Sequence, residues 1–313
     1  MTALLLLLAG AAAILFALFG KRIWAVLKAE WQTIVKQARA DVHQRKWEAN
    51  NPVGEPVSDE EAEDVVRWYR SLARPALLLT PAANPKADTG ARLGGSPWFA
   101  DGEHWPTDGN GQKLEFLAQI DFAQLPALDA FPDVGALRFF IGRDDIFGVN
   151  FDAPERGDFA ILWHPGPAEG GRYEPPLALT ADDGSPFQDE TVRVAGKAFD
   201  AALASDLPDA SSLEVQVRLD GQGRREGISE LEDELFTIAE ERPFGHRIGG
   251  HPTFTQSDFR MPGRNDEYDV VLLALTSDEW IMWGDVGEAV FMLRAADLAA
   301  RDFSRVAFYW DCH

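Results

Sequence analysis

The sequence predicts an α+β protein whose mainly antiparallel sheets form two pseudo-repeated lobes, preceded by a transmembrane helix and a juxtamembrane helix. Three observations lead to this prediction. The chain opens with a long apolar run, its body contains many short extended segments separated by Gly, Pro and Asp, and one set of motifs occurs twice in the same order. This spacing fits antiparallel strands joined by turns better than regular strand–helix–strand units.

The composition is that of an acidic globular chain. The 313 residues include 51 Asp or Glu and 29 Lys or Arg, which gives a formal charge of −22. We exclude nucleic acid as a partner, because affinity for a phosphate backbone depends on clustered cations that release counterions. Hydrophobic residues make up 46% of the chain, enough for a sizeable core in one or two domains. Cys312 is the single cysteine, which excludes an internal disulfide framework.

Residues 3–20 contain no charged or polar side chain and predict a transmembrane helix over 1–20. At about 1.5 Å per residue the run is roughly 27 Å long, close to the hydrocarbon thickness of a bilayer. A cleaved secretory signal is the alternative, but no Lys or Arg precedes the run and no small-x-small pattern follows Phe19. We expect a single-pass anchor in the bacterial inner membrane, which makes the membrane a partner through residues 3–20.

Residues 21–49 form a basic segment beside this anchor, with seven Lys or Arg and three Asp or Glu. Basic flanks stay on the cytoplasmic side, so we expect the globular part in the cytoplasm. An external domain on an uncleaved signal is the alternative. Apolar residues recur every three or four positions, which predicts a helix that either leans on anionic headgroups or acts as a spacer. With +4 in this segment, residues 50–313 carry −26.

Residues 50–74 are expected to form a linker followed by a capped helix. The stretch 50–57 contains two prolines and a glycine, which is typical of a linker. Ser58 and Glu61 then have the spacing of a capping box, and one apolar helical face continues as far as Leu72.

Further elements are expected along residues 75–313. Ser229 with Glu232 forms a second capping box and predicts a helix over 229–238, and residues 192–203 also have a helical pattern. Short extended runs bounded by turn residues predict strands. These runs lie at 76–80, 116–122, 136–142, 159–163, 213–219, 270–276, 289–293 and 305–310.

An internal repeat is the strongest signal in the sequence. The block RLGGSP at 92–97 is matched by RIGGHP at 247–252, which begins 155 positions later (247 − 92). Each block is followed by an apolar run, with Gln119 and Ala274 at equivalent places, and then by Asp-Val-Gly at 133–135 or 285–287. Three matched blocks in one order indicate two homologous lobes, at about 75–180 and 210–313.

The diglycine in each repeated block predicts a sharp, rigid turn. A Gly-Gly pair permits backbone angles that are closed to other residues, and the following Pro restricts Ser96 or His251 to extended geometry. Duplicated lobes usually pack about a pseudo-twofold axis, so we expect the two turns to meet near a shared cleft. The alternative is that both turns only redirect strands.

The repeated motifs together resemble the YwqG-like family of bacterial proteins. The blocks that carry the resemblance are RLGGSP at 92–97, WP at 105–106, FLAQID at 116–121, PDVGALRFF at 132–140, RIGGHPTFTQ at 247–256 and WGDVG at 283–287. The resemblance implies a duplicated α+β domain of unknown function over residues 75–313. This chain departs from the family pattern at Ala274, where Gln is frequent, and in its N-terminal anchor.

These blocks supply the candidate binding residues. Arginine forks suit carboxylate or phosphate groups, and tryptophans can wall a cleft. The alternative is that the arginines bridge local carboxylates and the tryptophans fill the core. We expect a membrane-tethered domain that binds a protein or small-molecule ligand between the lobes, and a hydrolase with Asp121 or Asp285 as general base is the alternative. The candidate residues are Arg92, Gly94, Gly95, Trp105, Gln119, Asp121, Arg247, Gly249, Gly250, Gln256, Trp283 and Asp285.

No cofactor and no metal site is expected. The sequence contains no Walker A loop, no Gly-x-Gly-x-x-Gly, no Gly-x-Ser-x-Gly and no His-Glu-x-x-His. The tail Asp311-Cys312-His313 supplies too few fixed ligands for a metal ion.

Overall fold

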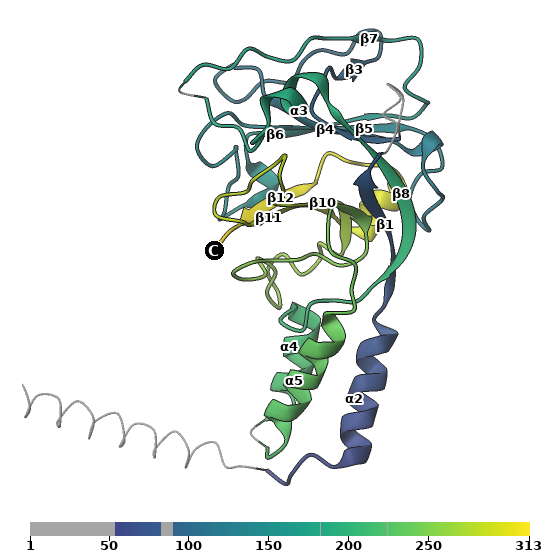
Figure 1. The fold of residues 1–313 in the computed structure, drawn as a ribbon, viewed down its shortest axis with the longest axis vertical. Coiled ribbons are helices and arrows are strands. Elements are labelled where there is room, and N and C mark those ends of the chain that lie inside the picture. The colour runs from purple at the N-terminus through teal and green to yellow at the C-terminus, as the bar shows by residue number, and fades with distance from the viewer. Residues whose placement is uncertain (1–53, 83–89, 182, 224) are drawn as a thin grey trace, which may run out of the picture. The chain divides into compact units, whose positions relative to one another are not determined.

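The computed structural model of the protein describes residues 54–82, 90–181, 183–223 and 225–313 (Figure 1). The expected transmembrane helix at 1–20, the basic segment at 21–49 and the start of the linker lie outside the described residues. Within the described ranges, none of the helices combines the length and the apolarity needed to span a bilayer.

The described chain forms two compact units. The described residues of the smaller one are 54–57, 222–223 and 225–228, and the Val57 N–H donates to the Glu226 carbonyl oxygen at 2.8 Å. In the same unit the Arg225 side chain donates to the Glu55 carbonyl oxygen at 2.7 Å. The larger unit contains Ser58–Gly221 and Ser229–His313, and both diglycine turns belong to it.

Short strands make up most of the larger unit. The strands are β1 (Arg74–Pro81), β2 (Ala91–Leu93), β3 (Trp98–Phe99), β4 (Glu115–Asp121), β5 (Ala136–Ile141), β6 (Phe159–His164), β7 (Arg172–Tyr173), β8 (Lys197–Asp206), β9 (Arg247–Gly249), β10 (Val270–Thr276), β11 (Glu288–Leu293) and β12 (Ala307–Asp311). The helices are α2 (Asp59–Ser71), α3 (Glu190–Ala195), α4 (Leu213–Asp220), α5 (Ile228–Ala239) and α6 (Ala295–Ala300), with 3-10 turns η1 (Phe122–Gln124) and η2 (Pro154–Arg156).

One large antiparallel sheet organises the larger unit. Its strand order is β12-β11-β10-β9-β1-β8-β2-β4-β5-β6, and neighbouring strands run antiparallel throughout. A separate two-stranded sheet pairs β3 with β7. The predicted class, a mainly antiparallel α+β fold, is confirmed.

The strands at the two ends of the strand order pair with one another in the same way. We call β2, β4, β5 and β6 the first half-sheet and β9, β10, β11 and β12 the second half-sheet. Arg92 lies opposite Gln119 in the first, as Arg247 lies opposite Ala274 in the second. Both β4 and β10 also shift register between their second and fourth residues where they pair with the next strand. The offset of the sequence repeat therefore reappears in the strand register.

A central ribbon of β1 and β8 joins the two half-sheets. The two strands pair from Arg74 opposite Asp206 to Pro81 opposite Phe199. β1 precedes the first half-sheet in the chain but borders β9 of the second half-sheet, whereas β8 borders β2 of the first. Each half-sheet is completed by a strand that comes from a distant part of the chain, so the halves depend on one another.

The core lies between the inner faces of the two half-sheets, because the sheet curls until its ends nearly close. Figure 1 shows β5 and β6 above β11 and β12. The ring centroid of Phe139 lies 4.9 Å from that of Phe291, and Phe159 lies 5.6 Å from Phe308. These rings belong to one continuous apolar cluster. Burying each such side chain stabilises the fold by about 1.5–3 kcal/mol.

Separate aromatic clusters cover the outer faces of the sheet. Successive residues of a strand point to opposite faces, so Phe139 faces the core while Phe140 faces outward. The outer clusters contain Phe99, Trp105, Phe116 and Phe140 on the first half-sheet and Phe254, Phe259, Tyr268 and Tyr309 on the second.

Three helices lie side by side beyond one end of the sheet, α2, α4 and α5 (Figure 1). The predicted capping box of α2 is confirmed, because the Ser58 side chain accepts from the Glu61 N–H and the Glu61 carboxylate accepts from the Ser58 N–H at 2.9 Å. The buried Tyr69 hydroxyl donates to the Pro208 carbonyl oxygen at 2.5 Å and connects α2 to the segment that leads into α4.

The element predicted as a strand at 213–219 was wrong, because these residues form helix α4. Its buried residues Val215 and Leu219 are four positions apart, which places them on one helical face. The second capping box is also displaced. Since α5 begins at Ile228, Ser229 lies inside the first helical turn rather than at its cap.

The helix predicted at 192–203 was wrong from Gly196 onward. α3 ends at Ala195, Gly196 adopts a φ of 84°, and the chain then continues as β8. A glycine tolerates this positive φ, which ends the helix and turns the chain into the ribbon.

Candidate functional site

The first diglycine turn is bound to β4 by the Arg92 side chain. Gly94 and Gly95 have φ values of 61° and 79°, a region that favours glycine. The half-buried guanidinium of Arg92 donates to the Ser96 carbonyl oxygen and, at 3.3 Å, to the Gln119 side-chain oxygen. The arginine that the repeat singled out therefore holds its own turn in place.

The second diglycine turn repeats this arrangement with greater burial. Arg247 is 1% exposed and donates to the His251 carbonyl oxygen at 2.8 and 3.1 Å. Asp206 lies 3.6 Å from the Arg247 side chain and accepts from the His251 N–H at 2.7 Å. Burial lowers the pKa of Arg247, although the Asp206 carboxylate opposes this shift. Arg247 is committed to the turn formed by Gly249 and Gly250.

The two turns lie at opposite ends of the central ribbon. A Cβ at Gly250 would meet Ala76 and Asp206, at the start of β1 and the end of β8. A Cβ at Gly95 would meet Gly196, directly before β8 begins. The 10 residues of β8 separate these places, which corresponds to about 30 Å at roughly 3.3 Å per residue. The expectation that the turns meet at one cleft therefore does not hold.

The other candidates of the first half-sheet make internal contacts. The Trp105 indole N–H donates to the Leu114 carbonyl oxygen at 2.8 Å. Gln119 is 6% exposed and accepts from the Trp98 N–H at 3.3 Å. Asp121 is buried and caps η1, as its carboxylate accepts from a backbone N–H at 3.1 Å.

The other candidates of the second half-sheet lie near the C-terminal strand. Trp283 is fully buried and packs edge-on against Phe147, with 5.5 Å between ring centroids. Gln256 is exposed, and its side-chain amide donates to the Cys312 carbonyl oxygen. Asp285 is also exposed. Neither side chain lies beside Gly249 and Gly250 in the pocket that these glycines help to line.

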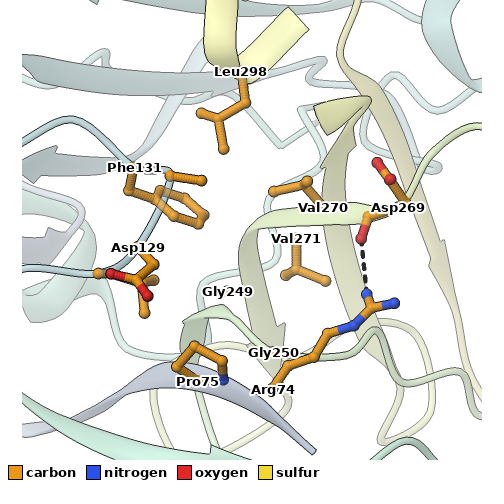
Figure 2. A pocket seen from close by; sticks show the side chains of 12 residues that line it. Arg74, Pro75, Asp129, Phe131, Gly249, Gly250, Asp269, Val270, Val271 and Leu298 are labelled. Carbon is orange, nitrogen blue, oxygen red and sulfur yellow. Dashed lines mark hydrogen bonds between the residues drawn. The ribbon is translucent and has the colours of Figure 1, made fainter. Parts of the chain in front are cut away.

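That pocket has a volume of about 250 Å³ and lies beside the second diglycine turn (Figure 2). Gly249 and Gly250 are the two candidate residues that reach it. The remaining lining comes from the start of β1, the loop after η1, the start of β10 and α6. These residues are Arg74, Pro75, Leu128, Asp129, Ala130, Phe131, Asp269, Val270, Val271 and Leu298.

The loop that forms one wall of the pocket is held by α6. The Arg301 side chain donates to the Ala130 carbonyl oxygen at 2.8 Å and to the Leu298 carbonyl oxygen at 2.9 Å. Ala130 itself has a φ of 67°, which is uncommon for a residue other than glycine. Because the loop precedes β5 and α6 precedes β12, both half-sheets determine the shape of the pocket.

Three charged side chains lie at the rim of the pocket. Arg74 donates to the Asp269 carbonyl oxygen at 3.0 Å, as Figure 2 shows. The Asp269 carboxylate accepts from the Ala295 N–H at 2.8 Å and so binds the first turn of α6. Asp129 lies on the opposite side of the pocket and is exposed (Figure 2). An apolar interior is therefore combined with a charged rim.

A pair of titratable side chains lies next to each diglycine turn. Behind the first, Glu115 is 2% exposed and lies 3.3 Å from Arg193, and burial raises the pKa of Glu115 to about 7 although Arg193 opposes the shift. Behind the second, His251 lies 3.1 Å from Glu214 and 2.8 Å from the Leu72 carbonyl oxygen. Burial by itself would raise the pKa of the Glu214 carboxyl. The contact with His251 and the nearby Arg260 outweigh this effect, and the resulting pKa is lowered to about 2.

Most of the pocket could not be identified from the sequence. Arg74 and Pro75 indicated only the end of a helix, and residues 128–131 belonged to a loop between predicted strands. The lining residues come from segments far apart in the chain and share no motif. The repeat identified the diglycine wall alone. Among the described residues, no group of three or more His, Cys, Asp and Glu is placed to hold a metal ion.

The protein thus contains a mainly antiparallel α+β domain with two similarly paired half-sheets. A family model described as a domain of unknown function, DUF1963, matches residues 91–312. This match covers more than half of the chain and both half-sheets, so the protein belongs to that family. Comparison with curated proteins finds no match. The narrower resemblance to YwqG-like proteins stays a prediction.

Proposed function

We propose that this domain binds a ligand, a small molecule or a protein segment, in the pocket beside the second diglycine turn. The observation that supports this proposal is the pocket itself, with its apolar interior, its charged rim and its volume of about 250 Å³. Ligand sites in proteins are generally concave and mostly apolar, with a few polar groups that orient the ligand.

This pocket takes the place of the cleft expected between the two turns. Arg247 and Gln119 are engaged in internal hydrogen bonds, whereas Arg74, Asp129 and Asp269 are exposed at the rim. We attribute the two half-sheets to duplication of one ancestral unit, which the repeated motifs and the matching strand register support. In this proposal the ligand binds where parts of both copies come together.

A fragment screen by ligand-observed NMR on the full chain tests the proposal. Val270→Trp places a large ring in the pocket, and Leu203→Trp is the matched control because Leu203 is 60% exposed on β8 and does not line the pocket. We expect fragments that bind the wild type to bind Leu203→Trp equally and to bind Val270→Trp at least tenfold more weakly. Equal binding to all three proteins would contradict the proposal.

We also propose that residues 3–20 tether this domain to the cytoplasmic face of a membrane. The support is the uncharged apolar run and the seven basic residues that follow it. An acidic body beyond a basic segment should be held away from an anionic surface, which would leave the pocket accessible.

A further inference from the structure

We propose that the occupant of the pocket is an organic ammonium ion that carries a small apolar arm. This inference rests on the proposed function, because it assigns a ligand class to the same pocket. It is carried by the separation of apolar and charged side chains around the pocket (Figure 2).

The interior of the pocket selects for an apolar arm of limited size. Phe131, Val270, Val271 and Leu298 line it with carbon atoms, and no charged side chain lies among these four in Figure 2. An apolar group that leaves water for such a surface is stabilised in proportion to the area that it buries. A volume of about 250 Å³ lies below the range of roughly 300–1,000 Å³ that is usual for drug-sized ligands, so a single ring or a short chain fits.

The charges that line the pocket favour a cationic head group. Arg74 and Asp269 lie together on one side and are joined by the hydrogen bond from Arg74 to the Asp269 carbonyl oxygen. One oxygen of the Asp269 carboxylate accepts a hydrogen bond from the Ala295 N–H. Across the pocket, the Asp129 carboxylate makes no hydrogen bond or ion pair within the described residues. The lining holds two carboxylates, of Asp129 and Asp269, and one guanidinium, of Arg74, so its formal charge is negative, and of the two carboxylates the one not bound by a backbone N–H belongs to Asp129.

Neighbouring cations do not cancel this charge. Arg301 directs its guanidinium to the carbonyl oxygens of Ala130 and Leu298 and forms no ion pair with Asp129. The wider field has the same sign as Asp129, because residues 50–313 carry −26. An acidic surface raises the local concentration of cations and lowers that of anions. The apolar arm supplies most of the affinity, and Asp129 selects the head group.

Three probes that share one arm separate these contributions. We would titrate 4-fluorophenethylamine, 2-(4-fluorophenyl)ethanol and 4-fluorophenylacetate into the full chain in zwitterionic nanodiscs, with empty nanodiscs as the blank. Binding would be followed by ¹⁹F NMR of the probe at neutral pH. We expect the amine to bind about fivefold to tenfold more tightly than the alcohol, because a hydrogen bond from an ammonium ion to a carboxylate is charge-assisted. We expect the carboxylate to bind most weakly, because the Asp129 carboxylate repels it.

A pair of charge-removing variants locates the effect. Asp129→Asn should weaken binding of the amine about fivefold to tenfold and leave binding of the alcohol unchanged. Asp133→Asn is the matched control. Like Asp129, Asp133 is an exposed acid in the loop before β5, but it does not line the pocket. It should leave the affinity of every probe within about twofold of the wild type. Equal losses of amine binding in the two variants would overturn the assignment of Asp129.

The remaining outcomes separate the ligand class from the proposed function. If the alcohol or the carboxylate binds as tightly as the amine, the ammonium assignment is wrong and the pocket proposal stands. If no probe and no fragment binds in a way that Val270→Trp weakens, the proposed function fails as well. A 4-fluorophenylalanyl-glycyl-glycine amide carries the same head group at a chain end. Binding of this peptide in preference to the free amine would place the ammonium ion on a polypeptide N-terminus.

Discussion

At the residue scale, the arginines of the repeat show how one side chain can close a turn. Arg92 and Arg247 each donate to the carbonyl oxygen four positions later, at Ser96 and His251. This carbonyl oxygen lies in the turn itself. A guanidinium has five N–H donors, so it can bind this oxygen and also a second acceptor such as the Gln119 side chain. Each of the two arginines therefore holds the backbone of its own turn.

The buried carboxyl of Glu115 should make stability depend on pH. Burial raises its pKa to about 7 in spite of Arg193, so the folded state favours the protonated form. This contribution to stability is then fully present below the unfolded pKa of 4.5 and is lost as pH rises through about 7. In urea unfolding, Glu115→Gln should reduce the decrease in unfolding free energy between pH 5 and pH 8 by about 1–3 kcal/mol.

Glu190 offers a matched control for this prediction. Its carboxylate also binds Arg193, at 2.6 Å, but it is largely exposed and this hydrogen bond lowers its pKa. Glu190→Gln should therefore leave the slope between pH 5 and pH 8 unchanged. A slope that is the same in the wild type and in Glu115→Gln would show that Glu115 does not titrate in this range.

At the element scale, the second diglycine turn should tolerate no side chain. A Cβ at Gly250 would contact the Asp206 carboxylate and would lie 3.1 Å from the Ala76 side chain, on a backbone with a φ of 70°. We expect Gly250→Ala to lower the unfolding free energy by about 2–4 kcal/mol, measured by urea unfolding, because it combines backbone strain with a clash at a buried carboxylate.

Gly263→Ala separates strain from the clash. Gly263 has a φ of 78°, close to that of Gly250, but a Cβ there would have no atom within 4 Å. Its replacement should cost about 1 kcal/mol from backbone strain alone. Similar losses in the two variants would mean that the contact with Asp206 adds nothing.

At the scale of the whole molecule, the segments of opposite charge predict how the chain associates with membranes. An apolar span is insensitive to salt, whereas attraction between basic residues and anionic lipids is screened. We expect the full chain to stay in the membrane pellet in 1 M NaCl and in alkaline carbonate, and to be released only by detergent. Deletion of residues 3–20 should move it to the supernatant.

The basic residues serve as the control for this membrane prediction. Replacement of the seven Lys and Arg of residues 21–49 by Gln should leave the chain in the pellet, because these residues are expected to set orientation rather than anchoring. Release of the wild-type chain by salt alone would show that surface electrostatics, and not a membrane span, holds it.

Local sequence patterns predicted those strands that consist of a short apolar run between turn residues. The runs that became β4, β5, β6, β10, β11 and β12 are short, apolar and bounded by turn residues, and the sequence placed them correctly. Residues 213–219 were wrongly predicted as a strand, because their alternating apolar residues also fit an amphipathic helix. Only the burial of Val215 and Leu219 on one face distinguishes the helix from the strand. The helix predicted at 192–203 was too long at its C-terminal end, because Gly196 ends the helix although apolar residues continue after it.

The acidic composition, most strands and the two diglycine turns can be predicted from the sequence, because they depend on residue type and on neighbours in the chain. The order of the strands cannot, since it depends on burial summed over the whole core, which no local pattern records. The folded protein places β1 beside β9 and β8 beside β2, which sets the two turns at opposite ends of the ribbon. It also brings Arg74, Asp129 and Asp269 to one pocket.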